Sequence, residues 1–189
     1  IVCQKIDRLK EAFNLTATSY GLQPITLLVI KNKDIQNRLL PHSFEQQQLV
    51  QASHILVICI KDIIDGAYIS QYFDKIKKIR NVSDEILEPF KNDLVDSFSK
   101  KDVAEIKSWS TNQAYLAMGN LLTICAIERI DSCPMEGFEP DGYDQVLGLK
   151  EKGLTSVLVM PIGYRADDDM FSTFKKVRKE MDESVIDIG

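Results

Sequence analysis

Apolar and polar positions follow two different periods along this chain. Three short runs, residues 25–30, 54–60 and 155–163, are almost wholly apolar and rich in β-branched residues. Such runs are typical of strands that are buried on both faces of a sheet. Residues 5–15 and 65–80 instead repeat their apolar positions at helical spacing. This order predicts layers of helices and strands, but the spacing does not tell whether the strands run parallel.

The longest apolar-periodic stretch covers residues 103–129, and we expect a central helix there. Its small residues, such as Ala114, Ala117 and Gly119, would let a second helix approach closely, as at a dimer interface. The preceding residues 82–103 are polar and rich in lysine, and they predict a surface helical excursion. At the other end of the chain, Val185–Ile188 alternates like an edge strand that has no partner in its own chain, so we expect it to pair with a partner subunit.

Composition narrows the class of protein. The chain has 189 residues, of which 44% are hydrophobic and 27% charged, as in a soluble globular domain. A net charge of -5 argues against nucleic acid or an anionic membrane as the main partner. No apolar run approaches the roughly 20 residues of a membrane helix, and no signal-peptide pattern is visible. The four cysteines form no CxxC pair and are interpreted as reduced thiols, which predicts a cytoplasmic protein.

The common catalytic motifs are absent from the sequence. It has neither of the two Gly-rich phosphate loops, no GxSxG elbow and no HExxH. Of its two histidines, His54 opens a buried strand and is interpreted as structural. We therefore predict no catalytic side chain and no metal site, and we expect an organic cofactor to supply the reactivity. The turn-prone segment 132–138, with Pro134 and Gly137, is the candidate for holding a flat cofactor with backbone N–H groups.

Three stretches together resemble the nitroreductase family of flavin enzymes. The first is residues 17–24, a hydroxyl-rich loop that ends in Gln-Pro and leads into a strand. The second is the helix with Trp109, Gln113, Tyr115, Gly119 and Asn120, followed by Pro-Met-Glu-Gly-Phe at 134–138. The third is residues 149–163. Each stretch alone is weak, but their joint order and spacing are specific, and the resemblance extends from Ile6 to the tail.

The resemblance implies a fold and an activity. The fold is an α+β, three-layer arrangement in which helices flank a central mixed sheet and the C-terminal strand is exchanged in an intertwined homodimer. The chain would form one domain over residues 1–189, without the family's N-terminal helix and its Arg-x-Ser-type phosphate clamp. FMN would lie in the dimer interface. NADH or NADPH would reduce it, and by ping-pong chemistry it would then reduce a small-molecule acceptor such as a nitroaromatic or a quinone.

The resemblance also implies roles for residues near the flavin. Pro134, Met135, Glu136 and Gly137 would lie against the isoalloxazine ring. The N–H groups of Glu136 and Gly137 would face flavin N5 and its neighbour, where a donor stabilises developing charge. The partner subunit would cover the flavin edge with the loop residues Ala17, Thr18, Ser19 and Gly21.

Two further groups of residues are implied to bind the flavin. Gln48 would hydrogen-bond the pyrimidine side of the ring, and Gln46 would replace a contact that is altered because Glu45 stands where the family often has Asn. Lys176 and Arg178 resemble the basic pair that binds the FMN phosphate. The alternative for this pair is a solvated helix face. The alternatives for the whole protein are a flavin-binding or redox-sensing protein without efficient turnover, and an interaction module with a degenerate site.

Overall fold

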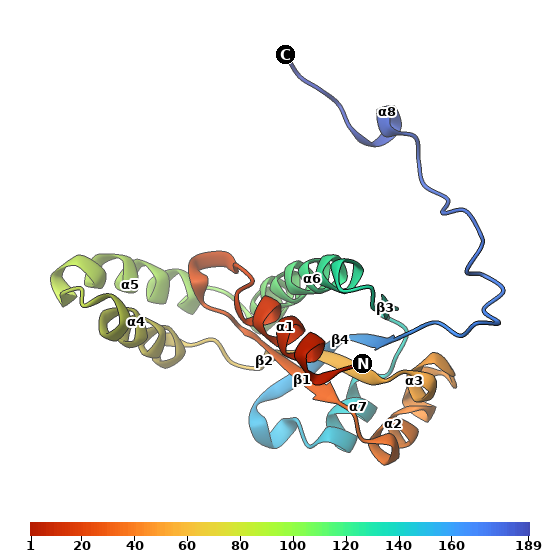
Figure 1. The fold of residues 1–189 in the computed structure, drawn as a ribbon. Helices are drawn as coiled ribbons and strands as arrows, with labels where there is room; N and C mark the ends of the chain where they lie inside the picture. Colours follow the sequence, from red (N-terminus) through yellow and green to blue (C-terminus); the bar gives the residue numbers. More distant parts are fainter.

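The computed structural model describes all residues from Ile1 to Gly189, and Figure 1 shows an α+β body from which the C-terminal tail extends. In chain order the elements are α1 (Cys3–Asn14), the 3₁₀ turn η1 (Ser19–Gly21), β1 (Ile25–Ile30), α2 (Lys33–Leu39), η2 (Pro41–Ser43), α3 (Gln48–Gln51), β2 (His54–Lys61), α4 (Gly66–Arg80), α5 (Asp84–Ser99), α6 (Val103–Ile127), β3 (Asp131–Ser132), α7 (Pro140–Leu147), η3 (Lys150–Lys152), β4 (Leu154–Gly163) and α8 (Met181–Ser184). None of these helices is long and apolar enough to cross a membrane.

The sheet has the strand order β1-β2-β4-β3, and every neighbouring pair is antiparallel. The prediction of a mixed sheet is therefore wrong for the strands of this chain. The physical reason is that the connections β1–β2 and β3–β4 return the chain to the end of the sheet that it left, whereas the long β2–β3 connection crosses to the opposite end, so that β3 runs antiparallel to its neighbour β4. A parallel strand would have to come from outside these four strands.

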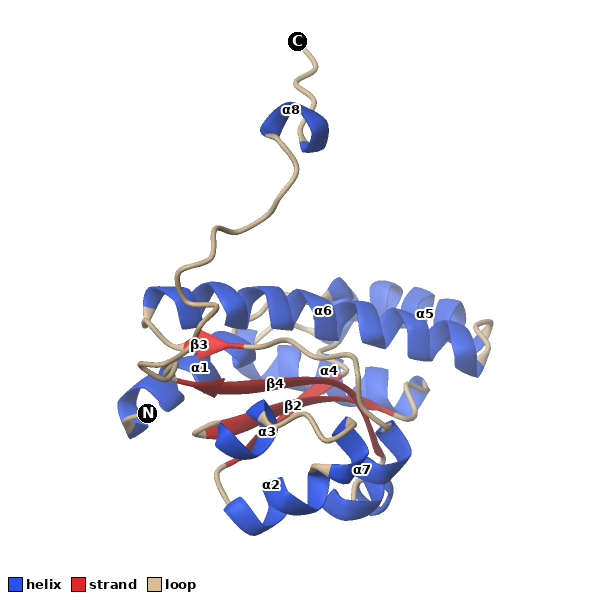
Figure 2. Ribbon diagram, turned by 90° about the vertical axis from the view of Figure 1, so that its right-hand side faces the viewer, coloured by secondary structure: helices blue, strands red, loops and turns tan.

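Both faces of the sheet are covered, which confirms the three layers (Figure 2). Because side chains alternate along a strand, β2 contributes to two cores. Toward α1 and α6 it presents Leu56, Ile58 and Ile60. Toward α2, α3 and α7 it presents Ile55, Val57 and Cys59. This double burial explains why the sequence of β2 is apolar throughout instead of alternating.

The helices α4 and α5 form a lobe beside the sheet with a core of its own (Figure 1). Phe73 from α4 and Phe98 from α5 are buried there, together with Leu22 from the loop before β1. Asp65 caps α4 by accepting a hydrogen bond from the backbone N–H of Tyr68 at 2.8 Å. The polar excursion predicted at 82–103 is thus α5, which packs on α4.

Helix α6 spans the upper layer in Figure 2, as predicted from its length and apolar pattern. It begins at a capping box in which Asp102 and Glu105 each accept a hydrogen bond from the other's backbone N–H. Its inner face is buried against the sheet. Its outer face carries exposed Tyr115 and Leu116, and no charged residue occurs between Lys107 and Glu128.

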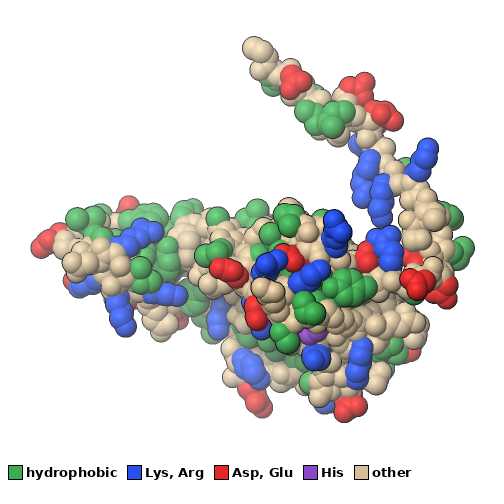
Figure 3. All heavy atoms as spheres, in the orientation of Figure 1, with side chains coloured by type: hydrophobic (Ala, Val, Ile, Leu, Met, Phe, Trp, Pro, Cys, Tyr) green, Lys and Arg blue, Asp and Glu red, His purple; other side chains and the backbone are tan.

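The tail leaves the body after β4 (Figure 1). Its first residues are fixed because the backbone N–H and the Nε of Arg165 each donate to the Asp131 carboxylate at 2.9 Å. Residues 171–189 are exposed throughout. Figure 3 shows basic side chains gathered along the tail, followed by acidic and hydrophobic ones toward the end. Val185–Ile188 forms no strand within this chain, so exchange of that strand stays a prediction.

Candidate functional site

The segment that follows α6 is fastened to the edge of β4. Cys133 N–H donates to Pro161 O at 3.0 Å, and Met135 exchanges two hydrogen bonds with Val159, at 2.7 and 3.1 Å. Met135 and Phe138 are buried under the segment. Pro134, Glu136 and Gly137 are exposed. The sheet thus anchors the segment by one side and leaves its other side on the surface.

Two adjacent backbone donors in this segment have no acceptor in the chain. They are the N–H groups of Glu136 and Gly137, whereas the carbonyl groups of the same two residues are both paired. Glu136 O accepts from Phe138 N–H at 3.0 Å, and Gly137 O accepts from Gln46 Nε2 at 2.8 Å. Both residues are exposed, so this neighbouring pair of N–H groups is accessible to an electron-rich ligand atom.

The glutamines Gln46 and Gln48 lie beside this segment, so the structure brings these two predicted residues to the loop. Gln46 Nε2 also donates to Ser43 O at 2.9 Å. Gln48 Nε2 donates to Gln46 Oε1 at 3.1 Å and lies 3.9 Å from Met135 Sδ. An open groove of about 840 Å³, bordered by Gln48 and Cys133, continues from here toward the start of the tail.

Tyr115 is a site residue to which the sequence assigned no role. Its hydroxyl on α6 donates a hydrogen bond to Glu136 Oε1. That hydrogen bond, together with burial, raises the pKa of Tyr115 above its ordinary value. The sequence carries no local signal for the contact, because 21 residues separate the two partners.

The loop with Ala17, Thr18, Ser19 and Gly21 lies elsewhere on the molecule. Ser19 N–H donates to Oε1 of the buried Gln113 at 2.8 Å, and Gly21 N–H donates to Thr18 O at 2.9 Å. Gly21 has a φ of +73°, which glycine adopts without strain. The structure thus gives these residues a defined conformation.

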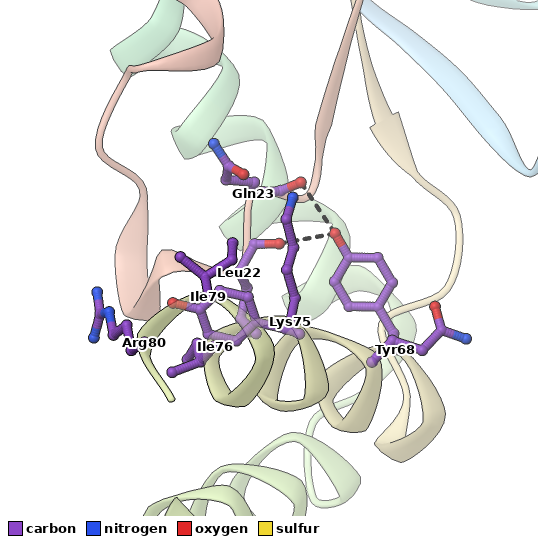
Figure 4. A pocket seen from close by; sticks show the side chains of 9 residues that line it. Leu22, Gln23, Tyr68, Lys75, Ile76, Ile79 and Arg80 are labelled. Atoms are coloured by element: carbon purple, nitrogen blue, oxygen red, sulfur yellow. Dashed lines mark hydrogen bonds between the residues drawn. The ribbon is translucent and has the colours of Figure 1, made fainter. Parts of the chain in front are cut away.

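Helix α4 supports this loop from the other side (Figure 4). The Tyr68 hydroxyl donates to Leu22 O at 2.8 Å and is 3.0 Å from Gln23 O. A Cβ on Gly21 would lie 2.1 Å from the Tyr72 hydroxyl, so only glycine leaves room for that ring. A groove of about 450 Å³ runs along α4 beside these contacts and has Lys75 and Arg80 among its lining residues.

The two predicted loops contact different sides of α6 within one chain. The first loop is held by Gln113, and the segment with Glu136 is held by Tyr115. Residues two apart on an α-helix point in directions about 200° apart. No hydrogen bond joins residues 17–21 to residues 134–137. The two loops therefore do not meet within one chain, and the contact of the first loop with the partner's flavin stays a prediction.

The basic pair Lys176 and Arg178 is not brought to either loop within the chain. Both side chains are exposed on the tail. Arg178 Nη1 donates to the adjacent Val177 O at 2.7 Å. His54 is buried at the start of β2, where its Nδ1 shares a hydrogen bond with Ser53 Oγ at 2.9 Å, and burial lowers its pKa. Its place in the fold agrees with a structural histidine.

Comparison with known sequences places the chain in a family of oxidoreductases. The chain belongs to the nitroreductase family, because the model of that family matches residues 3–164. It is 31% identical over 170 residues to YfkO of Bacillus subtilis, a protein that carries the provisional name NAD(P)H nitroreductase. That match covers 84% of this chain and 76% of YfkO.

Solved structures share the fold. A provisionally assigned nitroreductase of Bacillus subtilis, ydfN, superposes with a TM-score of 0.86 at 16% identity and covers 100% of this chain and 89% of its own. A provisionally assigned nitroreductase from Exiguobacterium sibiricum, solved in complex with FMN, superposes with a TM-score of 0.81 at 18% identity and covers 98% and 87%. These likenesses confirm the α+β nitroreductase fold that the sequence predicted.

Proposed function

We propose that this protein is an FMN-dependent NAD(P)H oxidoreductase that reduces nitroaromatics, quinones or similar small acceptors by a ping-pong mechanism. The observation that carries the proposal is the pair of unpartnered N–H groups at Glu136 and Gly137. They lie in the segment that the family resemblance assigns to the flavin ring. The names of relatives such as YfkO and the FMN complex of the Exiguobacterium protein support the same cofactors.

The residues around Gly137 fit a flat ring. Gly137 is exposed and has no side chain, so the backbone itself forms the surface at this position. Bound FMN supplies hydride acceptance and release. The chain supplies two fixed backbone donors, which stabilise negative charge at the ring position they face. No side chain of this chain needs to act as acid or base for hydride transfer, so these residues position the ring.

The other predicted contacts complete the proposed cofactor site. Gln46 and Gln48 are the candidates for the pyrimidine edge of the ring, since both lie beside Met135 and Gly137. Lys176 and Arg178 are the candidates for the phosphate, because a phosphate dianion favours cations and bidentate donors. Their place on an exposed tail supports delivery of the pair to a site between subunits.

We propose a homodimer in which each subunit completes the other's site. Three features support it: the uncharged outer face of α6, the free edge of β1, and the exposed apolar residues Val185 and Ile186 in the tail. A surface of this kind is costly to leave in water, and a free strand edge offers unpaired backbone groups to an added strand. Exchange of the tail strand would cover the exposed surface and pair the free strand edge. Dimerisation would also bring the loop residues Ala17, Thr18, Ser19 and Gly21 to the partner's flavin.

The first experiment is the absorbance spectrum of the purified protein, followed by NADH and NADPH oxidation with menadione or a nitrofuran as acceptor. We expect flavin bands and turnover that requires both substrates, with the parallel-line kinetics of a ping-pong enzyme. Bound flavin without NAD(P)H-dependent reduction would indicate a flavin-binding or redox-sensing protein instead. A protein that neither copurifies with FMN nor binds it in a titration would refute the proposal.

The second experiment tests the basic pair with a matched control. Replacing Lys176 and Arg178 with Ala removes the two predicted phosphate partners. Replacing the neighbouring Lys175 and Lys179 with Ala removes the same charge from the same tail. Because a hydrogen bond to a charged group contributes about 1.5–3 kcal/mol, we expect the first double variant to bind FMN at least about tenfold more weakly. Equal losses in both variants would show that only the general charge of the tail matters.

A further inference from the structure

The orientation of the two free N–H groups follows from the bonds around them. In a trans peptide the C=O and the N–H point in opposite directions. Met135 O accepts from Val159 N–H in β4, so the N–H of Glu136 points away from that strand. The carbonyls of Glu136 and Gly137 are held by Phe138 N–H and by Gln46. The backbone is therefore fixed on the sheet side and on the glutamine side.

The Glu136 side chain makes no contact with the sheet or the glutamines through a hydrogen bond. It is an exposed carboxylate on the same residue as one of the two donors. A free carboxylate here would be able to accept a hydrogen bond from its neighbours, and its charge would oppose negative charge on a ligand at the two amides. In the structure the carboxylate is instead bound by the Tyr115 hydroxyl from α6.

We propose that Tyr115 is a positioning residue that holds the Glu136 carboxylate against α6, so that the Glu136 and Gly137 amides keep their geometry and face a ligand without an adjacent free negative charge. This inference rests on the proposed function, because it concerns the flavin that those amides are proposed to bind. Tyr115 does not touch the ring in this account and acts only through Glu136. The raised pKa of Tyr115 agrees with such a role, because the phenol stays protonated and remains a donor.

The test uses Tyr115→Phe, which removes only the hydroxyl. Tyr164→Phe is the matched control, because Tyr164 is exposed and its hydroxyl makes no hydrogen bond within the chain. Glu136→Gln removes the charge, and the Tyr115→Phe, Glu136→Gln double variant tells whether Tyr115 acts through that charge. Two quantities are measured: the ratio of affinities for reduced and oxidised FMN, obtained from the midpoint potential, and the backbone order parameters of residues 136 and 137 by NMR in flavin-free protein.

We expect Tyr115→Phe to lower the preference for reduced FMN about three- to tenfold, as fits the loss of a charge-assisted hydrogen bond at a partly exposed site. Tyr164→Phe should leave it unchanged. Adding Tyr115→Phe to Glu136→Gln should change it much less than in the wild type. In flavin-free protein, the order parameters of the two amides should fall from rigid values near about 0.85 toward about 0.6 in Tyr115→Phe only.

Three results would overturn the inference. One is a reduced-to-oxidised affinity ratio in Tyr115→Phe that equals the ratio of Tyr164→Phe. Another is a change in that affinity ratio on Tyr115→Phe that is as large in the Glu136→Gln background as in the wild type. The third is an unchanged order parameter at both amides. Failure of the proposed function looks different: the wild type then holds no flavin, whereas the NMR measurement still reports whether Tyr115 fixes the segment.

Discussion

Replacing Gly21 with Ala tests the account of the loop before β1 most directly. The backbone of Gly21 has a φ of +73°, and a left-handed conformation costs an L-residue about 1–2 kcal/mol. The new Cβ would lie 2.1 Å from the Tyr72 hydroxyl and 3.0 Å from its Cζ, so the ring has to move. Displacing a packed side chain costs typically about 1–3 kcal/mol. We therefore expect a total loss of roughly 2–5 kcal/mol in the free energy of unfolding.

Thermal and urea unfolding measure this loss. For a chain of this size, a loss near the middle of the range lowers Tm by about 10 °C. Gly153→Ala is the matched control, because Gly153 has a φ of +61° and an added Cβ would meet nothing within 4 Å. It should show the backbone cost alone, about 1–2 kcal/mol. Adding Tyr72→Phe to Gly21→Ala removes the atom at 2.1 Å and should recover part of the packing cost.

The reasoning fails if Gly21→Ala and Gly153→Ala lose the same stability, because the Tyr72 contact would then contribute nothing. It also fails if Tyr72→Phe recovers none of the loss in the double variant. The same variant has a second readout, since Gly21 belongs to the loop proposed to cover the partner's flavin. A displaced loop should weaken FMN binding in Gly21→Ala, whereas Gly153→Ala should retain it.

Three further predictions concern thiols, subunit contact and pH. Burial raises the pKa of Cys59 to about 12 and that of Cys125 to about 11, so a thiol reagent at pH 8 should label two thiols in the folded protein and all four in urea. The two reactive thiols should be the exposed Cys3 and Cys133. Leu116→Glu places a charge on the outer face of α6 and should yield monomers with weakened FMN binding in light scattering and titration, whereas an unchanged dimer would contradict the proposed interface. Arg165 lowers the pKa of Asp131, so the pair stabilises the fold above the unfolded pKa of about 3.9 and loses that contribution as the pH falls through the folded value. The stability difference between wild type and Arg165→Ala should therefore be present at pH 7 and vanish in acid, and a constant difference would refute this.

Much of the fold was predictable from local pattern. The run 25–30 is the strand β1 with the expected bounds, and the apolar period over residues 65–80 predicted α4 to within a residue. The relative direction of the strands was not predictable, because it depends on the end of the sheet at which each connecting segment brings the chain back. The two-residue strand β3 was missed, since two residues carry no detectable period.

The sequence predicted the part of the site that depends on turn residues, but not the contacts that depend on how distant elements pack. The turn residues Pro134 and Gly137 indicated a segment with available N–H groups, and the structure shows them at Glu136 and Gly137. The contact from Tyr115 was not predictable, because it depends on how α6 lies over that segment. Lys176 and Arg178 lie on the exposed tail and contact neither loop within the chain, so their role at the phosphate stays a prediction.

The free edge of β1 also has a consequence for how the protein is made. β1 precedes the other strands of the sheet in the chain, and it pairs within the chain only with β2. Its sequence, Ile-Thr-Leu-Leu-Val-Ile, has the β-propensity and the lack of charge of an aggregation-prone segment. The tail segment proposed to cover that edge is synthesised after the strands of the sheet and would come from another molecule. Newly made chains therefore pass through a period in which β1 is open to mispairing, and its length depends on the concentration of partner chains.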